Sequence, residues 1–78
     1  MKINVTIHLF FEIKNSYMFE YETGYSETKA DLNTENFEHF NLEQYAEEQR
    51  KGFAQMCKVP IENVRIISRK EYEDNTED

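Results

Sequence analysis

The chain has 78 residues, a formal net charge of −7 and a single cysteine, Cys57. A chain of this length makes one domain, and its single cysteine excludes an internal disulfide, so the hydrophobic core must supply the stability. Polar and apolar residues alternate at the N-terminus, so we expect neither a signal peptide nor a membrane helix and predict a cytoplasmic location.

The first predicted element is a long β-strand over residues 3–13. Every odd position in this stretch is apolar, and the even positions are polar except for Phe10. Successive side chains of a strand point to opposite faces, so one face of this strand is apolar throughout and needs a covering layer. Phe10 is expected on the opposite face, where it would form an exposed patch with His8 and Met18 that contacts a partner or a second copy of the chain, making a homodimer.

A second strand is predicted from Tyr17 to about Tyr25, after turn residues at 14–16. A two-residue loop would set Phe11 against Glu20, which conflicts with a shared apolar face. A three-residue loop avoids the conflict and predicts these pairs: Ile13 with Tyr17, Phe11 with Phe19 and Leu9 with Tyr21. The tyrosines of this strand are therefore expected in the core.

An irregular connection is expected between Ser26 and Phe40, with Thr34 capping a short helical turn. The following helix has two start signals. Asn41 and Gln44 form a capping box, and Phe40 and Tyr45 form a hydrophobic staple. Pro60 predicts the end of this helix near Lys58.

The predicted helix has one face expected to cover the sheet. This face comprises Leu42, Tyr45, Ala46, Gln49, Phe53, Met56 and Cys57. Gly52 destabilises a helix interior by about 1 kcal/mol relative to alanine, so we expect it to allow a close approach to the sheet.

A final strand is predicted within residues 63–72, carrying Arg65 and Arg69. A right-handed crossover through the helix places this strand parallel to the second one, with the first strand between them and antiparallel to both. The sequence therefore predicts an α+β fold of two layers, ββαβ, with a three-stranded antiparallel sheet in the order 2-1-3 and one helix packed on one face. Residues 1–73 are expected to form a single domain, and residues 74–78 a disordered acidic tail.

The charges are unevenly distributed along the chain. Nine of the sixteen acidic residues lie between Glu20 and Glu48, where Lys29 is the one base, and six bases lie between Arg50 and Lys70. We hypothesise a small acidic protein-interaction module whose carboxylates stand in for nucleic-acid phosphates, so that its partner is a basic, nucleic-acid-binding protein. The residues expected to bind this partner are Glu20, Glu22, Glu27, Asp31, Glu35, Glu38, Glu43 and Phe10.

Two other interpretations of the charges stay open at this point. The acidic residues are explained equally well as a solvated surface that provides solubility. The alternative function is a small nucleic-acid-binding protein that uses the basic segment 50–70. The negative net charge and the acidic tail would repel the phosphates of a nucleic acid, so direct nucleic-acid binding is not expected. Residue usage rich in Phe, Tyr, Met, Ile, Asn and Lys and poor in Gly, Ala, Arg and Pro is typical of AT-rich genomes, which favours an inhibitor from a bacteriophage or another mobile element.

No catalytic motif is found in the sequence. His8 and His39 are far apart in the chain, and Cys57 falls on the predicted core face of the helix. Asp31, Glu35, Glu38 and His39 match no metal-ligand spacing, and two glycines are too few for a phosphate-binding loop. We therefore expect no enzymatic activity, no cofactor and no metal site.

Overall fold

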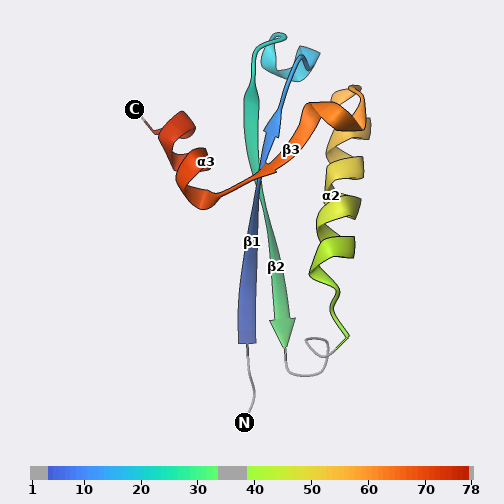
Figure 1. Ribbon diagram of the computed structural model, residues 1–78, viewed down its shortest axis with the longest axis vertical. Helices are drawn as coiled ribbons and strands as arrows, with labels where there is room; N and C mark the ends of the chain where they lie inside the picture. Colours follow the sequence, from blue (N-terminus) through green and yellow to red (C-terminus); the bar gives the residue numbers. More distant parts are fainter. Residues whose placement is uncertain (1–3, 34–38, 78) are drawn as a thin grey trace.

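The protein has an α+β fold built on a three-stranded antiparallel sheet with the order β2-β1-β3 (Figure 1). The computed structural model describes residues 4–33 and 39–77. The strands are β1 (Asn4–Ile13), β2 (Gly24–Asn33) and β3 (Val64–Ile67), the helices are α2 (Leu42–Cys57) and α3 (Arg69–Thr76), and 3₁₀ turns span Tyr17–Phe19 and Ile61–Asn63. The predicted fold class, strand order and strand directions are confirmed.

β1 is the central strand, as its unbroken apolar alternation predicts. It pairs along its whole length with β2 and over Phe10–Ile13 with β3. Its apolar odd-numbered face is covered by α2, and the buried cluster between them consists of Phe11, Ile13, Ala54, Cys57 and Val64. The predicted helix on one face of the sheet is therefore present.

The predicted hairpin register is wrong, because the second strand begins at Gly24 and not at Tyr17. Ile13 pairs with Gly24, and the chain between them makes the first 3₁₀ turn. Glu20 and Tyr21 adopt left-handed backbone conformations, with φ of 55° and 65°. An extended strand cannot run through two left-handed residues, so the aromatic alternation from Tyr17 to Tyr25 is not a strand.

Gly24 marks the start of β2 for a steric reason. A Cβ atom at this position would lie 2.2–2.4 Å from atoms of the Phe19 ring, so only glycine leaves room for that ring against the core. The strand then continues to Asn33, and the predicted irregular connection is wrong over residues 26–33. Residues 34–38, including the predicted helical turn at Thr34, lie outside the described residues.

The predicted start and end of α2 are confirmed. The Asn41 side chain accepts a hydrogen bond of 3.0 Å from the backbone N–H of Gln44. The rings of Phe40 and Tyr45 lie 5.4 Å apart, as the predicted staple requires. The helix ends at Lys58, whose left-handed conformation forms the C-cap.

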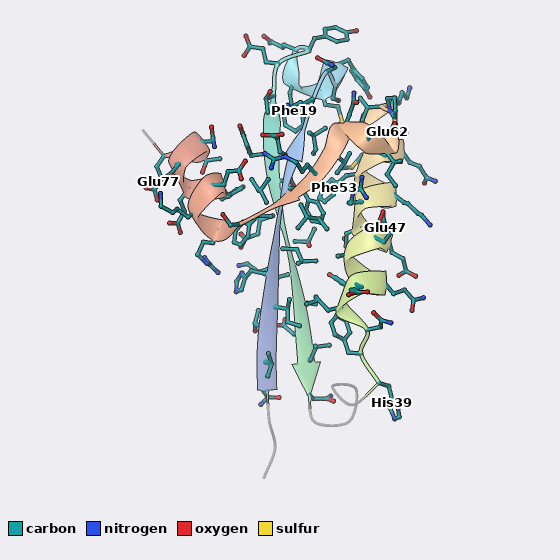
Figure 2. All side chains as sticks on the ribbon, viewed as in Figure 1. Phe19, His39, Glu47, Phe53, Glu62 and Glu77 are labelled. Atoms are coloured by element: carbon teal, nitrogen blue, oxygen red, sulfur yellow. The ribbon has the colours of Figure 1, made fainter. Side chains whose placement is uncertain are left out.

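The predicted core face of α2 is only partly correct. Ala46 and Cys57 are buried as predicted, and Phe53 points from the helix toward the sheet, with its ring 4.9 Å from that of Phe11 (Figure 2). Ala54, which the prediction left out, is also buried. Leu42 and Met56 are instead exposed. A Cβ at Gly52 would meet nothing within 4 Å, so the predicted close approach of this glycine to the sheet is wrong.

The last strand is shorter than predicted and is followed by a helix. β3 ends at Ile67, and Ser68 caps α3 by accepting a hydrogen bond of 3.1 Å from the backbone N–H of Glu71. α3 lies on the face of the sheet opposite α2, where the ring of Tyr72 is 4.9 Å from that of Phe10. The predicted strand through Tyr72 is therefore wrong after Ile67.

Phe10 points away from α2, as predicted, but it is not exposed. Its side chain is 6% exposed because Tyr72 covers it and the Arg69 guanidinium lies 4.9 Å from its ring centroid. Met18 lies in the first 3₁₀ turn and not on this face. The predicted open patch of Phe10, His8 and Met18 therefore does not form.

The C-terminal residues continue α3 as far as Thr76, and Glu77 caps it. The division into a domain over residues 1–73 and a disordered tail over 74–78 stays a prediction. Asp74 accepts a bond of 3.0 Å from Lys70 across one exposed helical turn. Residue 78 lies outside the described residues.

Candidate functional site

The predicted acidic residues lie mainly along β2 and the segment that leads into it. Glu20 and Glu22 precede β2 at one end of the sheet, whereas Glu27 and Asp31 lie on the strand itself. β2 is an edge strand, so this part of the prediction, an acidic edge of the sheet, agrees with the topology. Glu43 lies in the exposed first turn of α2, and Glu35 and Glu38 lie outside the described residues.

The two acids within β2 have partners on β1. The Glu27 carboxylate lies 2.8 Å from Nδ1 of His8, and the Thr6 hydroxyl donates a hydrogen bond of 2.7 Å to Asp31. Both pairs lie on the α3 side of the sheet, where even-numbered residues of β1 face odd-numbered residues of β2. These contacts fix the two carboxylates in place and reduce their availability to a partner.

The loop before β2 presents a different chemistry. Tyr17 is 51% exposed, Met18 48% and Tyr21 71%, although the sequence predicted both tyrosines in the core. Glu20 and Glu22 are exposed beside them, and neither forms an ion pair with a cation of residues 4–33 or 39–77. We call this set the loop surface: Tyr17, Met18, Glu20, Tyr21 and Glu22. It lies at the upper end of the sheet in Figure 1.

The loop surface is held in one shape by buried contacts beneath it. Ser16 is fully buried, and its hydroxyl donates a hydrogen bond of 3.0 Å to the carbonyl of Cys57 while accepting one from the backbone N–H of Met18. The Ser16 carbonyl accepts bonds from the backbone N–H groups of Phe19 and Tyr21 at 3.0 and 2.9 Å. The end of α2 therefore fixes the conformation of the loop.

The basic residues of segment 50–70 are largely engaged within the protein. Arg50 donates to the carbonyls of Val64 and Ile61 at 2.8 and 3.0 Å and pairs with Glu47. Lys58 lies over the Tyr17 ring. Arg69 and Lys70 contact Phe10 and Asp74, as described above. These contacts leave Lys51 as an exposed base of this segment with no such contact among the described residues.

Arg65 joins the sheet to α3 through two carboxylates. Its guanidinium lies 3.3 and 3.2 Å from the two oxygens of Glu12, a side chain that is 10% exposed, and it also pairs with Glu71 of α3. The hydrogen bonds that Arg65 donates to Glu12 and Glu71 raise the pKa of Arg65 above its ordinary value. This cluster is explained by the packing of α3, because it satisfies a carboxylate beneath that helix.

The described residues give no sign of a metal centre or a membrane span. Within 4–33 and 39–77, no three His, Cys, Asp or Glu side chains gather as metal ligands do, and no helix has the length and apolar character to cross a bilayer. Cys57 is 1% exposed, which agrees with the predicted packing position. The absence of enzymatic activity stays a prediction.

The chain was compared with protein families, curated proteins and solved structures. No family model matches it, and neither the curated proteins nor the solved structures contain a match.

Proposed function

We propose that the protein is a small acidic interaction module that binds a basic, nucleic-acid-binding protein through the loop surface. The observation that carries this proposal is the combination of exposed Tyr17, Met18 and Tyr21 with the carboxylates of Glu20 and Glu22, which have no ion pair among the described residues. Tyrosine and methionine are enriched at protein interfaces, where they supply contact area. Exposed tyrosine rings and carboxylates together suit arginine and lysine side chains of a partner.

The rigidity of the loop supports the same proposal. Ordering a flexible loop on binding costs free energy, and a loop that is already fixed avoids most of that cost. The buried Ser16 and its bonds to Cys57, Met18 and Tyr21 provide this order before any partner arrives. The module therefore presents the carboxylates of Glu20 and Glu22 from a backbone that is already ordered.

The placement of the bases favours this proposal over direct nucleic-acid binding. A phosphate-binding surface needs several free cations on one face. Here Arg50, Arg65 and Arg69 are engaged in contacts that stabilise the fold. The proposal includes a cytoplasmic location and an inhibitory role, in which the module competes with nucleic acid for the partner.

The experiment begins with affinity capture of partners from the source cell, followed by competition. The captured protein is titrated with its nucleic acid in the presence of the module, at low and physiological salt. We expect displacement of the nucleic acid that weakens as salt rises, because exposed charges are screened over about 8–10 Å at physiological ionic strength.

Charge reversal on the loop surface then tests the site. Glu20→Lys combined with Glu22→Lys should slow association roughly tenfold or more at low salt. The matched control is Glu73→Lys combined with Glu77→Lys on α3, which changes the net charge equally at a different place. Equal effects of the two double variants would show a net-charge effect and no specific site. Salt-sensitive binding of the module to bare DNA or RNA in a gel-shift assay would contradict the proposal.

A further inference from the structure

β1 has a free edge along its N-terminal half. β3 pairs only with Phe10–Ile13, so residues 4–9 have no strand beside them on that side within the described part of the chain. Figure 1 shows open space along this side of the lower half of β1. A free strand edge exposes a row of backbone N–H and C=O groups that another strand can pair with.

The ladder shows which residues direct their backbone groups to this edge. The N–H of Lys14 donates a bond of 3.0 Å to the carbonyl of Asn63, on the β3 side of β1. The registers with β2 and β3 run without interruption, and backbone groups alternate sides along a strand. Even-numbered residues therefore point toward the β3 side, which places the N–H and C=O groups of Asn4, Thr6 and His8 on the free edge.

The free edge of β1 and the outer edge of β2 differ in how they are protected. The outer edge of β2 carries charged residues at Glu27, Lys29 and Asp31, and charges on an edge discourage further strand pairing. Residues 4–9 of β1 contain no Asp, Glu, Lys, Arg or Pro. Of these two edges, that of β1 is the less protected against pairing with another strand.

We propose that the free edge of β1 pairs with the same edge of a second copy of this chain, in an antiparallel dimer whose two-fold axis passes beside Thr6. Thr6 then faces Thr6 of the partner subunit, Asn4 faces His8 of the partner subunit, and Val5 faces Ile7 of the partner subunit. Even residues meet even residues, so the free N–H and C=O groups lie opposite one another. This inference does not depend on the proposed function, because it uses the N-terminal half of β1 and no residue of the loop surface.

The neighbouring registers fit less well. A shift of one residue would place an apolar residue against a polar one on each face, because the side-chain period of a strand is two. A two-fold axis at Ile7 would place Asn4 of the partner subunit opposite Phe10, where Ile67 of β3 already pairs. The axis at Thr6 uses residues 4–8 of both copies and avoids β3.

Side chains on both faces suit this pairing. Val5 and Ile7 are only partly buried in the single chain and lie beside Leu32 and Ala30 of β2. In the dimer, one row across the sheet would contain Leu32, Val5, Ile7 of the partner subunit and Ala30 of the partner subunit, all apolar. No like charges meet across the axis, because residues 4–7 are uncharged on both copies.

The shape of the single chain leaves surface for such an interface. Its accessible area is 5861 Å², whereas a compact monomer of this mass is expected to have about 5,000 Å². Its radius of gyration is 14.1 Å, against about 11.5 Å for a compact domain of this length. A contact built on five residues per chain is at the small end of specific interfaces, so we expect a concentration-dependent dimer.

The test is sedimentation equilibrium of the full chain over a wide range of concentration. We expect the apparent mass to rise from 9.4 kDa toward twice that value. Thr6→Pro removes the N–H groups that pair at the axis, and because these groups face the free edge it removes no backbone hydrogen bond to β2. The side-chain bond of Thr6 to Asp31 is lost in each chain. We expect this change to raise the dissociation constant about thirtyfold, for two lost hydrogen bonds. Lys29→Pro on the outer edge of β2 is the matched control and should leave association unchanged.

A second variant and a second measurement test the proposal even if the proline variant misfolds. Thr6→Lys places two cations opposite each other at the axis, while Asp31 remains beside each in its own chain, so it should weaken the dimer and leave the monomer folded. Amide hydrogen exchange at Thr6 and His8 should slow as the concentration rises. A mass of 9.4 kDa at every concentration, or a dimer that neither Thr6 variant weakens, would overturn the proposal.

Discussion

The half of the molecule in which β3 completes the sheet differs from the half formed by β1 and β2 alone. In the three-stranded half, α2 and α3 cover opposite faces, and Phe11, Ile13 and Val64 are 0% exposed. In the two-stranded half, Val5 and Ile7 remain partly exposed on the same face of the same strand. The same apolar alternation of β1 is therefore buried in one half and partly exposed in the other. The elements packed beside β1, and not its own residues, decide how much of each side chain is buried.

This contrast assigns stability and association to different places. The three-stranded half carries most of the apolar burial and should dominate the free energy of unfolding. The loop surface and the free edge of β1 lie outside it and are available for contact. Changes in the core should therefore affect folding first, whereas changes at the contact surfaces should affect binding first.

The largest expected effect is that of Phe11→Ala. This change removes a fully buried ring from the three-stranded half and should cost about 3–5 kcal/mol, a large part of the stability of so small a domain. Val5→Ala, on the same face in the two-stranded half, should cost about 1 kcal/mol because the side chain is only partly buried. Denaturant unfolding measures both. Similar costs for the two variants would remove the distinction between the halves.

Phe10→Ser tests whether α3 belongs to the stable half. The structure buries Phe10 beneath Tyr72 and Arg69, so this change should cost about 3 kcal/mol, whereas the exposed position expected from the sequence would make it nearly neutral. Thermal and denaturant unfolding provide the measurement. An unchanged unfolding transition would mean that α3 does not cover this face in solution.

Ser16→Ala tests the contact by which the core holds the loop surface in place. It leaves the carbonyl of Cys57 without the hydroxyl donor and should cost about 1–2 kcal/mol. It should also weaken partner binding, because the loop loses part of its fixed conformation. Thr23→Ala, an exposed change on the same loop, serves as the control. Weaker binding with no loss of stability would point instead to a direct contact of Ser16 with the partner.

Removal of residues 74–78 should have the smallest effect. The deletion removes the exposed pair of Lys70 with Asp74 and the last turn of α3, while Tyr72 and its contact with Phe10 remain. Exposed ion pairs of this kind contribute about 0.3–0.5 kcal/mol, so the unfolding free energy should change by no more than about 0.5 kcal/mol. A loss above about 1 kcal/mol would show that the end of α3 contributes to the stable half.

The sequence was sufficient for elements whose signals are local. The apolar alternation of β1 and the caps at Asn41 and Lys58 depend on neighbouring residues only, and both elements were predicted correctly. α3 also has a local signal, since Ser68 and Glu71 have the spacing of a capping box, but the expected strand across residues 63–72 obscured it.

β2 and the loop surface could not be predicted because their determinants are distant in the sequence. The residues of β2 that face α2 include Ser26, Thr28 and Ala30, which give no apolar alternation. The bond between Ser16 and Cys57, which are 41 residues apart, turns the loop and exposes Tyr17 and Tyr21. No local pattern contains that contact, so the alternating aromatics of the loop were interpreted as a strand.

Residue-resolved amide hydrogen exchange at a protein concentration low enough to limit association tests the contrast between the halves most directly. The N–H groups of Val5, Ile7, Phe11 and Ile13 all point toward β2, so all four have the same partner strand. Val5 and Ile7 lie in the two-stranded half, whereas Phe11 and Ile13 lie in the three-stranded half. We predict that Phe11 and Ile13 exchange only through global unfolding, whereas Val5 and Ile7 exchange through local opening with a smaller free energy. Equal opening free energies at all four positions would contradict the division into a stable half and an open half.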